Sequence, residues 1–223
     1  MRPFWIGATL AVLATACGHS PAPAPSARPT TPAHGTVVNP ANIKRVVRDM
    51  PPNYEVTTGI PSGASPRMIW SRDADEKVRP PQCAALADPG NDRDQSAQGM
   101  SASGAGGVVD AIVVSLPGPV DLDRDIVAAC GQWSMTAART TITVHLADPP
   151  HIDGADTVGM VTDTKSSVES GTEIDSRTYT FVAYLGNYYA FTTLTTDPGS
   201  ALPALPPQFA ADLLVKTVST LRG

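Results

Sequence analysis

Two β-rich runs near the C-terminus are separated by only two residues. Residues 177–185 and 188–196 are rich in Thr, Tyr, Phe and Val, and Gly186-Asn187 lies between them. A Gly-Asn pair in this position is typical of a primed two-residue turn, which joins antiparallel neighbours in a β-hairpin. The chain is therefore expected to contain an antiparallel sheet, with this hairpin as its most clearly marked part.

Several other segments also have the character of strands. Residues 108–116 form an apolar run in which Val113-Val114 indicates burial on both faces, so this strand is expected near the centre of the sheet. Residues 140–146 alternate apolar and polar side chains, the pattern of a half-buried strand. The remaining expected strands are residues 54–60, 68–70, 98–103, 132–138 and, more weakly, 157–163.

Helices are expected at the two ends of the folded region and at two short places between them. Asn39-Pro40 is a typical helix start, and a long apolar stripe follows Pro206-Pro207 at the C-terminus. Residues 81–88 and 121–129 predict shorter helices. The sequence thus predicts a single α+β domain at 39–223, an antiparallel sheet with helices packed mainly on one side and the C-terminal helix closing the domain.

The N-terminal part of the chain has a different composition. Residues 4–14 carry no charge and follow Arg2, which is typical of an export signal, and the run is too short to span a bilayer. Residues 18–38 consist mainly of Pro, Ala, Ser and Thr, with too little apolar surface to offset the entropy of ordering, so they predict an extended tether. The net charge of −5 argues against a nucleic-acid partner.

The segment Ala14-Thr15-Ala16-Cys17 resembles the lipobox of bacterial lipoproteins. This resemblance implies cleavage before Cys17 and attachment of a diacylglycerol to its sulfur. Residues 1–16 are then a lipoprotein signal peptide and 17–38 the lipidated cysteine with its tether. The protein is expected on the extracytoplasmic face of the cell membrane, anchored by lipid. The alternative is simple secretion, with Cys17 removed or left as a thiol.

Two cysteines remain once Cys17 carries lipid. Cys83 and Cys130 are an even pair in an exported protein, where oxidation is the rule, so they are expected to form a disulfide. The alternative, a reactive or metal-bound thiol, requires a neighbouring His or a second close Cys, and neither flanks these positions.

No catalytic or metal-binding motif is complete. The segment Gly99 to Gly104 approaches the G-x-S-x-G elbow of serine hydrolases, but Ser103 replaces the last glycine and a strand follows in place of a helix. A hydrolase using Ser101 or Ser103, with His145 or His151 as base, is the less favoured alternative. The acidic residues around these two histidines lack a metal-ligand spacing, so no metal or cofactor is expected.

Aromatic side chains are the candidate ligand-binding residues. They are Trp70, Trp133, Tyr184, Tyr188 and Tyr189, and they are expected to line a groove for an envelope lipid, a glycan or a protein. The alternative is ordinary packing in the core.

Taken in order, several segments resemble a family of uncharacterised mycobacterial lipoproteins. The Pro-x-Cys-Ala segment at Cys83, the β-rich middle and the C-terminal helix are more distantly similar to the extracellular sensor domain of PknH-type kinases. The resemblance implies a surface-tethered, non-enzymatic envelope lipoprotein with a ligand-binding or sensor-like domain. The alternative is an accessory lipoprotein that recruits a protein partner. The segments are residues 39–43, 50–55, 81–86, 101–104, 188–191, 197–198 and 213–222.

Overall fold

The computed structural model describes residues 37–59, 65–70, 77–91, 93–167, 171–196, 200 and 203–223. All of them belong to the second of two units of the chain, Thr36–Gly223. The signal peptide, the lipidation of Cys17 and the tether up to residue 36 lie outside the described residues and stay predictions.

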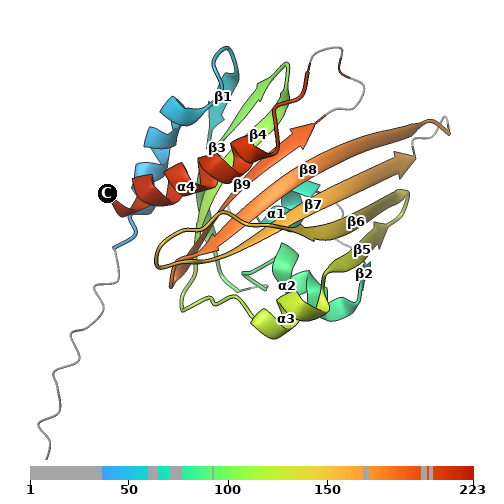
Figure 1. Ribbon diagram of the computed structural model, residues 1–223, viewed down its shortest axis with the longest axis horizontal. Coiled ribbons are helices and arrows are strands. Elements are labelled where there is room, and N and C mark those ends of the chain that lie inside the picture. The colour runs from blue at the N-terminus through green and yellow to red at the C-terminus, as the bar shows by residue number, and fades with distance from the viewer. Residues whose placement is uncertain are drawn as a thin grey trace, which may run out of the picture. The chain divides into compact units, whose positions relative to one another are not determined.

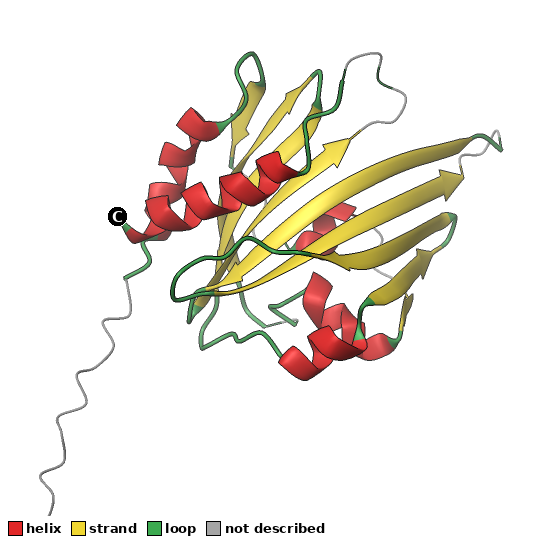
Figure 2. Ribbon diagram, in the orientation of Figure 1, coloured by secondary structure: helices red, strands yellow, loops and turns green. Residues whose placement is uncertain are grey.

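A single sheet of nine strands forms the centre of this unit (Figures 1 and 2). Every pair of neighbouring strands is antiparallel, and the order across the sheet is β1-β3-β4-β9-β8-β7-β6-β5-β2. The strands are β1 (Glu55–Thr58), β2 (Lys77–Arg79), β3 (Ser96–Gly104), β4 (Gly107–Ser115), β5 (Gln132–Ala137), β6 (Thr140–Ala147), β7 (Asp156–Ser167), β8 (Glu173–Tyr184) and β9 (Tyr188–Thr196).

The hairpin predicted from Gly186-Asn187 is present as β8 and β9. The Leu185 amide donates to the Tyr188 carbonyl at 2.8 Å, which closes a two-residue connection. Gly186 has a φ of +73°, a left-handed conformation that glycine adopts without steric cost. The α+β class, the antiparallel sheet and the C-terminal helix are confirmed.

The helices are divided between the two faces of the sheet, which corrects the expectation that they lie mainly on one side. In Figure 1, α4 crosses the sheet on the side opposite to α1, α2 and α3. Periodicity shows which stripe of a helix is apolar but not which sheet face it meets, so this division was not predictable. The helices are η1 (Pro40–Asp49), α1 (Pro66–Trp70), η2 (Pro81–Cys83), α2 (Ala84–Ala87), α3 (Arg124–Ala129) and α4 (Gln208–Arg222).

The two longest helices, η1 and α4, share one face, here called the α4 face. Asn39 caps η1 by accepting a hydrogen bond from the Ala41 amide at 3.1 Å, and the Asn39 amide donates to the Leu221 carbonyl at 2.8 Å. This second bond ties the start of the domain to the end of α4. Val46 and Leu214 are fully buried between these helices and the sheet.

The opposite face is called the disulfide face because Cys83 and Cys130 pack on it. The two residues form a disulfide with Cα atoms 5.7 Å apart, joining η2 to the residue that follows α3. Trp133 and Met135 of β5 lie in the same apolar cluster, together with Leu86 of α2. The short helices α1, α2 and α3 therefore cover an apolar core of their own.

Three local expectations were wrong or incomplete. Residues 68–70 belong to helix α1 and not to a strand, because a three-residue apolar run does not distinguish the two and Pro66 favours a helix start. The edge strand β2, with only three residues, was not predicted. Strand β7 is longer than expected because it is paired along its length with β8.

Candidate functional site

One charged side chain lies inside the sheet. Among the described residues, Asp110 of β4 is the only buried one that carries a formal charge, and it is 5% exposed. Alternation along β4 places Asp110 on the disulfide face, since Ile112 and Val114 belong to that core. A carboxyl group in this position loses its hydration and needs compensating partners.

Hydroxyl groups provide those partners. The Thr193 hydroxyl donates to Oδ2 of Asp110 at 2.6 Å, and the Ser101 hydroxyl hydrogen-bonds the same carboxyl. Ser101 and Thr193 lie directly opposite Asp110 on the two neighbouring strands, β3 and β9. Within the described part of the chain, no Lys, Arg or His side chain forms an ion pair with this carboxyl.

Threonines extend this polar region across the sheet. Thr180 of β8 lies opposite Thr193, and Thr178 lies opposite Thr195 with their hydroxyls 3.0 Å apart. The centre of an otherwise apolar face is thus lined by hydroxyl groups around one carboxyl. The polar cluster, as it is called below, consists of Ser101, Asp110, Thr178, Thr180, Thr193 and Thr195.

Trp70 contacts the polar cluster, and Trp133 packs against Trp70. The Trp70 Nε1 group donates to the Thr180 hydroxyl at 2.9 Å, and the ring centroids of Trp70 and Trp133 are 6.0 Å apart. The Nε1 group of Trp133 is buried and has no hydrogen-bond acceptor in the structure. An unsatisfied buried donor costs about 1–3 kcal/mol, which makes it a point where a ligand or a water would be stabilising.

An open pocket lies next to the polar cluster, where β9 ends. Strand β8 starts at Glu173, whereas its pairing with β9 begins at Arg177, so the first residues of β8 extend past the end of β9. The pocket there, called the strand-end pocket, has a volume of about 440 Å³, within the usual range for small-molecule sites. Its lining includes Ser103, Val108, Ile174, Ser176 and Thr195, together with one carboxylate, Asp175.

The strand-end pocket and Asp110 share one face of the sheet. Val108 of the pocket lies two residues from Asp110 along β4, and Ser103 lies two residues from Ser101 along β3. Each pair is separated by about 7 Å. Val108 is 38% exposed and Ser101 is half-buried. Asp110 therefore has a partly exposed neighbour along β4 and another across from it on β3. The arrangement places an open pocket about 7 Å along the same sheet face from a buried carboxyl, which does not itself line the pocket.

Burial raises the pKa of Asp110 above its ordinary value of 3.8, and the hydrogen bonds from Thr193 and Ser101 oppose this rise. Burial is the larger effect, so the protonated form is favoured more in the native state than in the unfolded chain. Such a perturbed carboxyl beside a pocket is typical of a functional site.

We expect Asp110→Asn to increase the free energy of unfolding near neutral pH by about 1–3 kcal/mol, because asparagine keeps the shape but has no charge to bury. Below the ordinary pKa of 3.8, native and unfolded carboxyls are both protonated, so this advantage disappears. It grows as the pH rises above 3.8, because the unfolded carboxyl ionises while the native one still holds its proton, and it levels off once the native carboxyl has ionised too. Urea unfolding at about pH 3 and about pH 7 measures the difference; an advantage that is equal at both would contradict this account.

The predicted aromatic groove is not present as one surface. Trp70, Trp133, Tyr184 and Tyr189 are all buried in the core of the disulfide face. Tyr188 packs against the core of the opposite, α4 face. Alternation along β9 separates Tyr188 from Tyr189, a consequence that follows from the period of a strand.

Asp110 is not among the candidate residues named from the sequence, although the sequence contains a signal for it. It is the one carboxylate in the apolar run of residues 108–116, which was predicted to be buried on both faces. Those two observations together predict a buried carboxyl. Its partners Ser101 and Thr193 depend on the register of three strands, which the sequence does not show.

Ser101 and His145, two of the residues named for the alternative serine hydrolase, lie on opposite faces of the sheet. Ser101 points to the disulfide face and bonds Asp110. His145 lies on β6 between Val144 and Leu146, whose side chains belong to the disulfide-face core, so its own side chain is on the other face. Among the described residues there is also no group of three His, Cys, Asp or Glu side chains placed to hold a metal.

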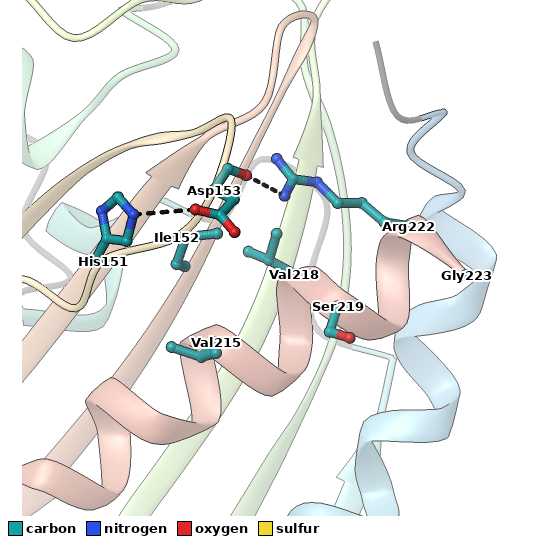
Figure 3. Close-up of a pocket in the computed structure, with 8 residues that line it drawn as sticks. All are labelled: His151, Ile152, Asp153, Val215, Val218, Ser219, Arg222 and Gly223. Atoms are coloured by element: carbon teal, nitrogen blue, oxygen red, sulfur yellow. Dashed lines mark hydrogen bonds and ion pairs between the residues drawn. The ribbon is translucent and has the colours of Figure 1, made fainter. Parts of the chain in front are cut away.

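A second pocket lies between α4 and the loop that joins β6 to β7 (Figure 3). Its volume is about 380 Å³. The Arg222 guanidinium donates to the carbonyls of Asp153 and Gly154 at 2.6 and 2.9 Å, and His151 contacts Asp153 at 3.1 Å. These groups hold the loop against α4, so the pocket is best explained as a structural contact.

Comparison with known proteins places the chain in a family. The family model described as "Domain of unknown function (DUF5642)" matches residues 39–222. The chain belongs to the DUF5642 family. No curated protein sequence matches this DUF5642 protein. None of the described helices has the length and apolar character needed to span a membrane.

Two solved mycobacterial structures resemble this DUF5642 protein. An uncharacterised protein from Mycobacterium smegmatis, an Rv0999 ortholog, has a TM-score of 0.64 at 20% identity, over 84% of this chain and 98% of that chain. The extracellular domain of PknH from Mycobacterium tuberculosis has a TM-score of 0.41 at 14% identity, over 83% of this chain and 92% of that chain. The resemblance to mycobacterial proteins stated from the sequence is confirmed, and the first structure shows that the fold is shared.

Proposed function

We propose that this DUF5642 protein is a lipid-anchored, non-enzymatic binding domain of the mycobacterial cell envelope. In this proposal the sequence of the N-terminus supplies export and the anchor at Cys17. The tether places the domain outside the cytoplasmic membrane. The domain binds a small ligand at the strand-end pocket and the polar cluster, and so has a sensor-like role.

One observation carries the binding function. Asp110 is a buried carboxyl without a counter-charge in the described structure, and an open pocket lies about 7 Å away on the same sheet face. A core that served only to stabilise the fold would gain by having an apolar residue here. The unsatisfied Nε1 group of Trp133 on the same face supports the same interpretation.

Binding is favoured over catalysis by the chemistry of the cluster. Its groups are hydroxyls that hydrogen-bond one another, Asp110 or Trp70, and His145 lies on the other face of the sheet. A hydroxyl nucleophile requires an adjacent base that is held in position by a third group. The cluster has the fixed, convergent polar groups that a ligand-binding pocket requires.

Intrinsic tryptophan fluorescence tests this proposal directly. Trp70 and Trp133 are the tryptophans of the domain; Trp70 bonds Thr180 of the polar cluster and Trp133 packs against Trp70, while Trp5 falls in the predicted signal peptide. A probe panel of simple sugars, amino acids, alkyl amines, alcohols and fatty acids is titrated into the purified protein. We expect at least one class to change the emission and to raise the midpoint of thermal unfolding.

The matched control is a pair of single variants, Trp70→Phe and Trp133→Phe, which assign the signal to one ring. A silent panel, with no change in emission or in thermal midpoint for any probe, would contradict the binding function. Capture of a protein partner by such a silent domain would then favour the accessory role.

The anchor is tested separately. Cys17→Ser removes the sulfur that the lipobox resemblance predicts to be acylated, so we expect the protein to leave the detergent phase and to appear in the soluble export fraction or to remain unprocessed. Two acyl chains bury many CH₂ groups at about 0.8 kcal/mol each, so the loss is expected to be nearly complete. Ser26→Ala in the predicted tether is the control and keeps the anchor. Unchanged detergent partition of Cys17→Ser would contradict lipidation.

A further inference from the structure

We infer that the ligand of this pocket is a short-chain alkyl amine, bound with its ammonium group at Asp110 and its apolar chain in the strand-end pocket. This inference rests on the proposed binding function and adds the chemical class of the ligand. Three observations lead to it: the charge of the buried group, the hydrogen bonds that it already makes, and the composition of the adjacent pocket.

The charge of Asp110 calls for a cation. In the described structure its carboxyl is compensated only by the hydroxyls of Thr193 and Ser101, and no basic side chain is paired with it. Hydroxyl donors stabilise a buried carboxylate less than an ion pair with additional hydrogen bonds does. A cationic ligand would compensate the negative charge of the Asp110 carboxylate, whereas an anionic ligand would be repelled by it.

The burial of Asp110, which is 5% exposed and already bonded by two hydroxyls, favours a compact ammonium group over a guanidinium. A carboxylate has about four lone-pair positions, and Thr193 and Ser101 occupy two of them. The flat guanidinium fork pairs best when one position on each oxygen faces it. A compact ammonium group is a point charge with rotatable donors and needs only a single accessible position.

The pocket accounts for the rest of the ligand. Val108 is 38% exposed and Ile174 is 55% exposed, and both line the strand-end pocket. Exposed apolar side chains at a concave site favour an apolar partner. Val108 lies about 7 Å from Asp110 along β4, a distance that a short alkyl chain spans. An amine with a short apolar chain therefore matches both ends of the site.

Three probes of equal length separate the contributions of charge and chain: hexylammonium, hexanol and hexanoate. We expect hexylammonium to change the tryptophan emission and to raise the thermal midpoint near neutral pH, with hexanol much weaker and hexanoate silent. Asp110→Asn should bind hexylammonium at least about thirtyfold more weakly, the lower end for truncating one partner of a buried charged pair. This variant is expected to fold, because it removes a buried charge.

Asp163→Asn is the matched control. It changes a carboxyl of β7 whose side chain is 38% exposed and paired with Arg177, and it should bind hexylammonium as the wild type does. Equal affinity of wild type and Asp110→Asn, or stronger binding of hexanol or hexanoate, would overturn the amine assignment. If only sugars or fatty acids bind, the ligand class is wrong while the binding function stands; if no probe of either panel binds, both fail.

Discussion

Removing the disulfide is expected to lower the free energy of unfolding by about 4 kcal/mol. Cys83 and Cys130 are separated by 47 residues, and closing a loop of this length restricts the unfolded chain by roughly that amount in the chain-entropy model. Both residues are completely buried in the disulfide-face core, beside the short helices α2 and α3. These helices are too short to be stable alone, so they depend on the crosslink and on packing.

The double variant Cys83→Ser, Cys130→Ser and the wild type reduced with a phosphine should show the same loss in urea unfolding. Alkylation before and after reduction should differ by two thiols in the domain. Cys17→Ser serves as the control because it changes a cysteine outside the domain and should leave its stability unchanged. If both thiols of the native protein react without reduction, the disulfide is absent from the molecule in solution.

The second large effect is expected on the other face of the sheet. Leu214 of α4 is fully buried in the α4-face core, and Leu214→Ala should lower the free energy of unfolding by about 2–5 kcal/mol. The loss combines the transfer of the missing methyl and methylene groups with the cavity that remains. Thr192 of β9 also bonds the Ala210 carbonyl at 2.7 Å, so α4 has little freedom to shift and fill the space.

The neighbouring Val215 provides a matched control on the same helix. Its side chain is 39% exposed, so Val215→Ala should change the free energy of unfolding by less than about 1 kcal/mol. Urea unfolding followed by circular dichroism measures both variants. A similar loss for the two substitutions would show that α4 is not docked through the face that carries Leu214.

The sequence by itself determined the local elements of this protein. The pair Gly186-Asn187 specified the β8–β9 hairpin because a primed turn allows only one strand direction. The apolar run at 108–116 specified a central strand, and the stripe that contains Leu214 specified the closing helix. The cysteine count singled out the pair Cys83 and Cys130. Each of these depends on residues close in the sequence or on simple counting.

Only the tertiary structure decided which residues meet. Sheet order placed β4 next to β9, and the register of β3, β4 and β9 brought Ser101, Asp110 and Thr193 into one row. The packing of α1 and β5 on the disulfide face buried Trp70 and Trp133 against each other, and not in the open groove expected from the sequence. Strands that are far apart in the sequence can pair in many registers, and the local sequence favours none of these registers strongly. The outcome of strand pairing depends on the packing of both faces together, which no short segment encodes.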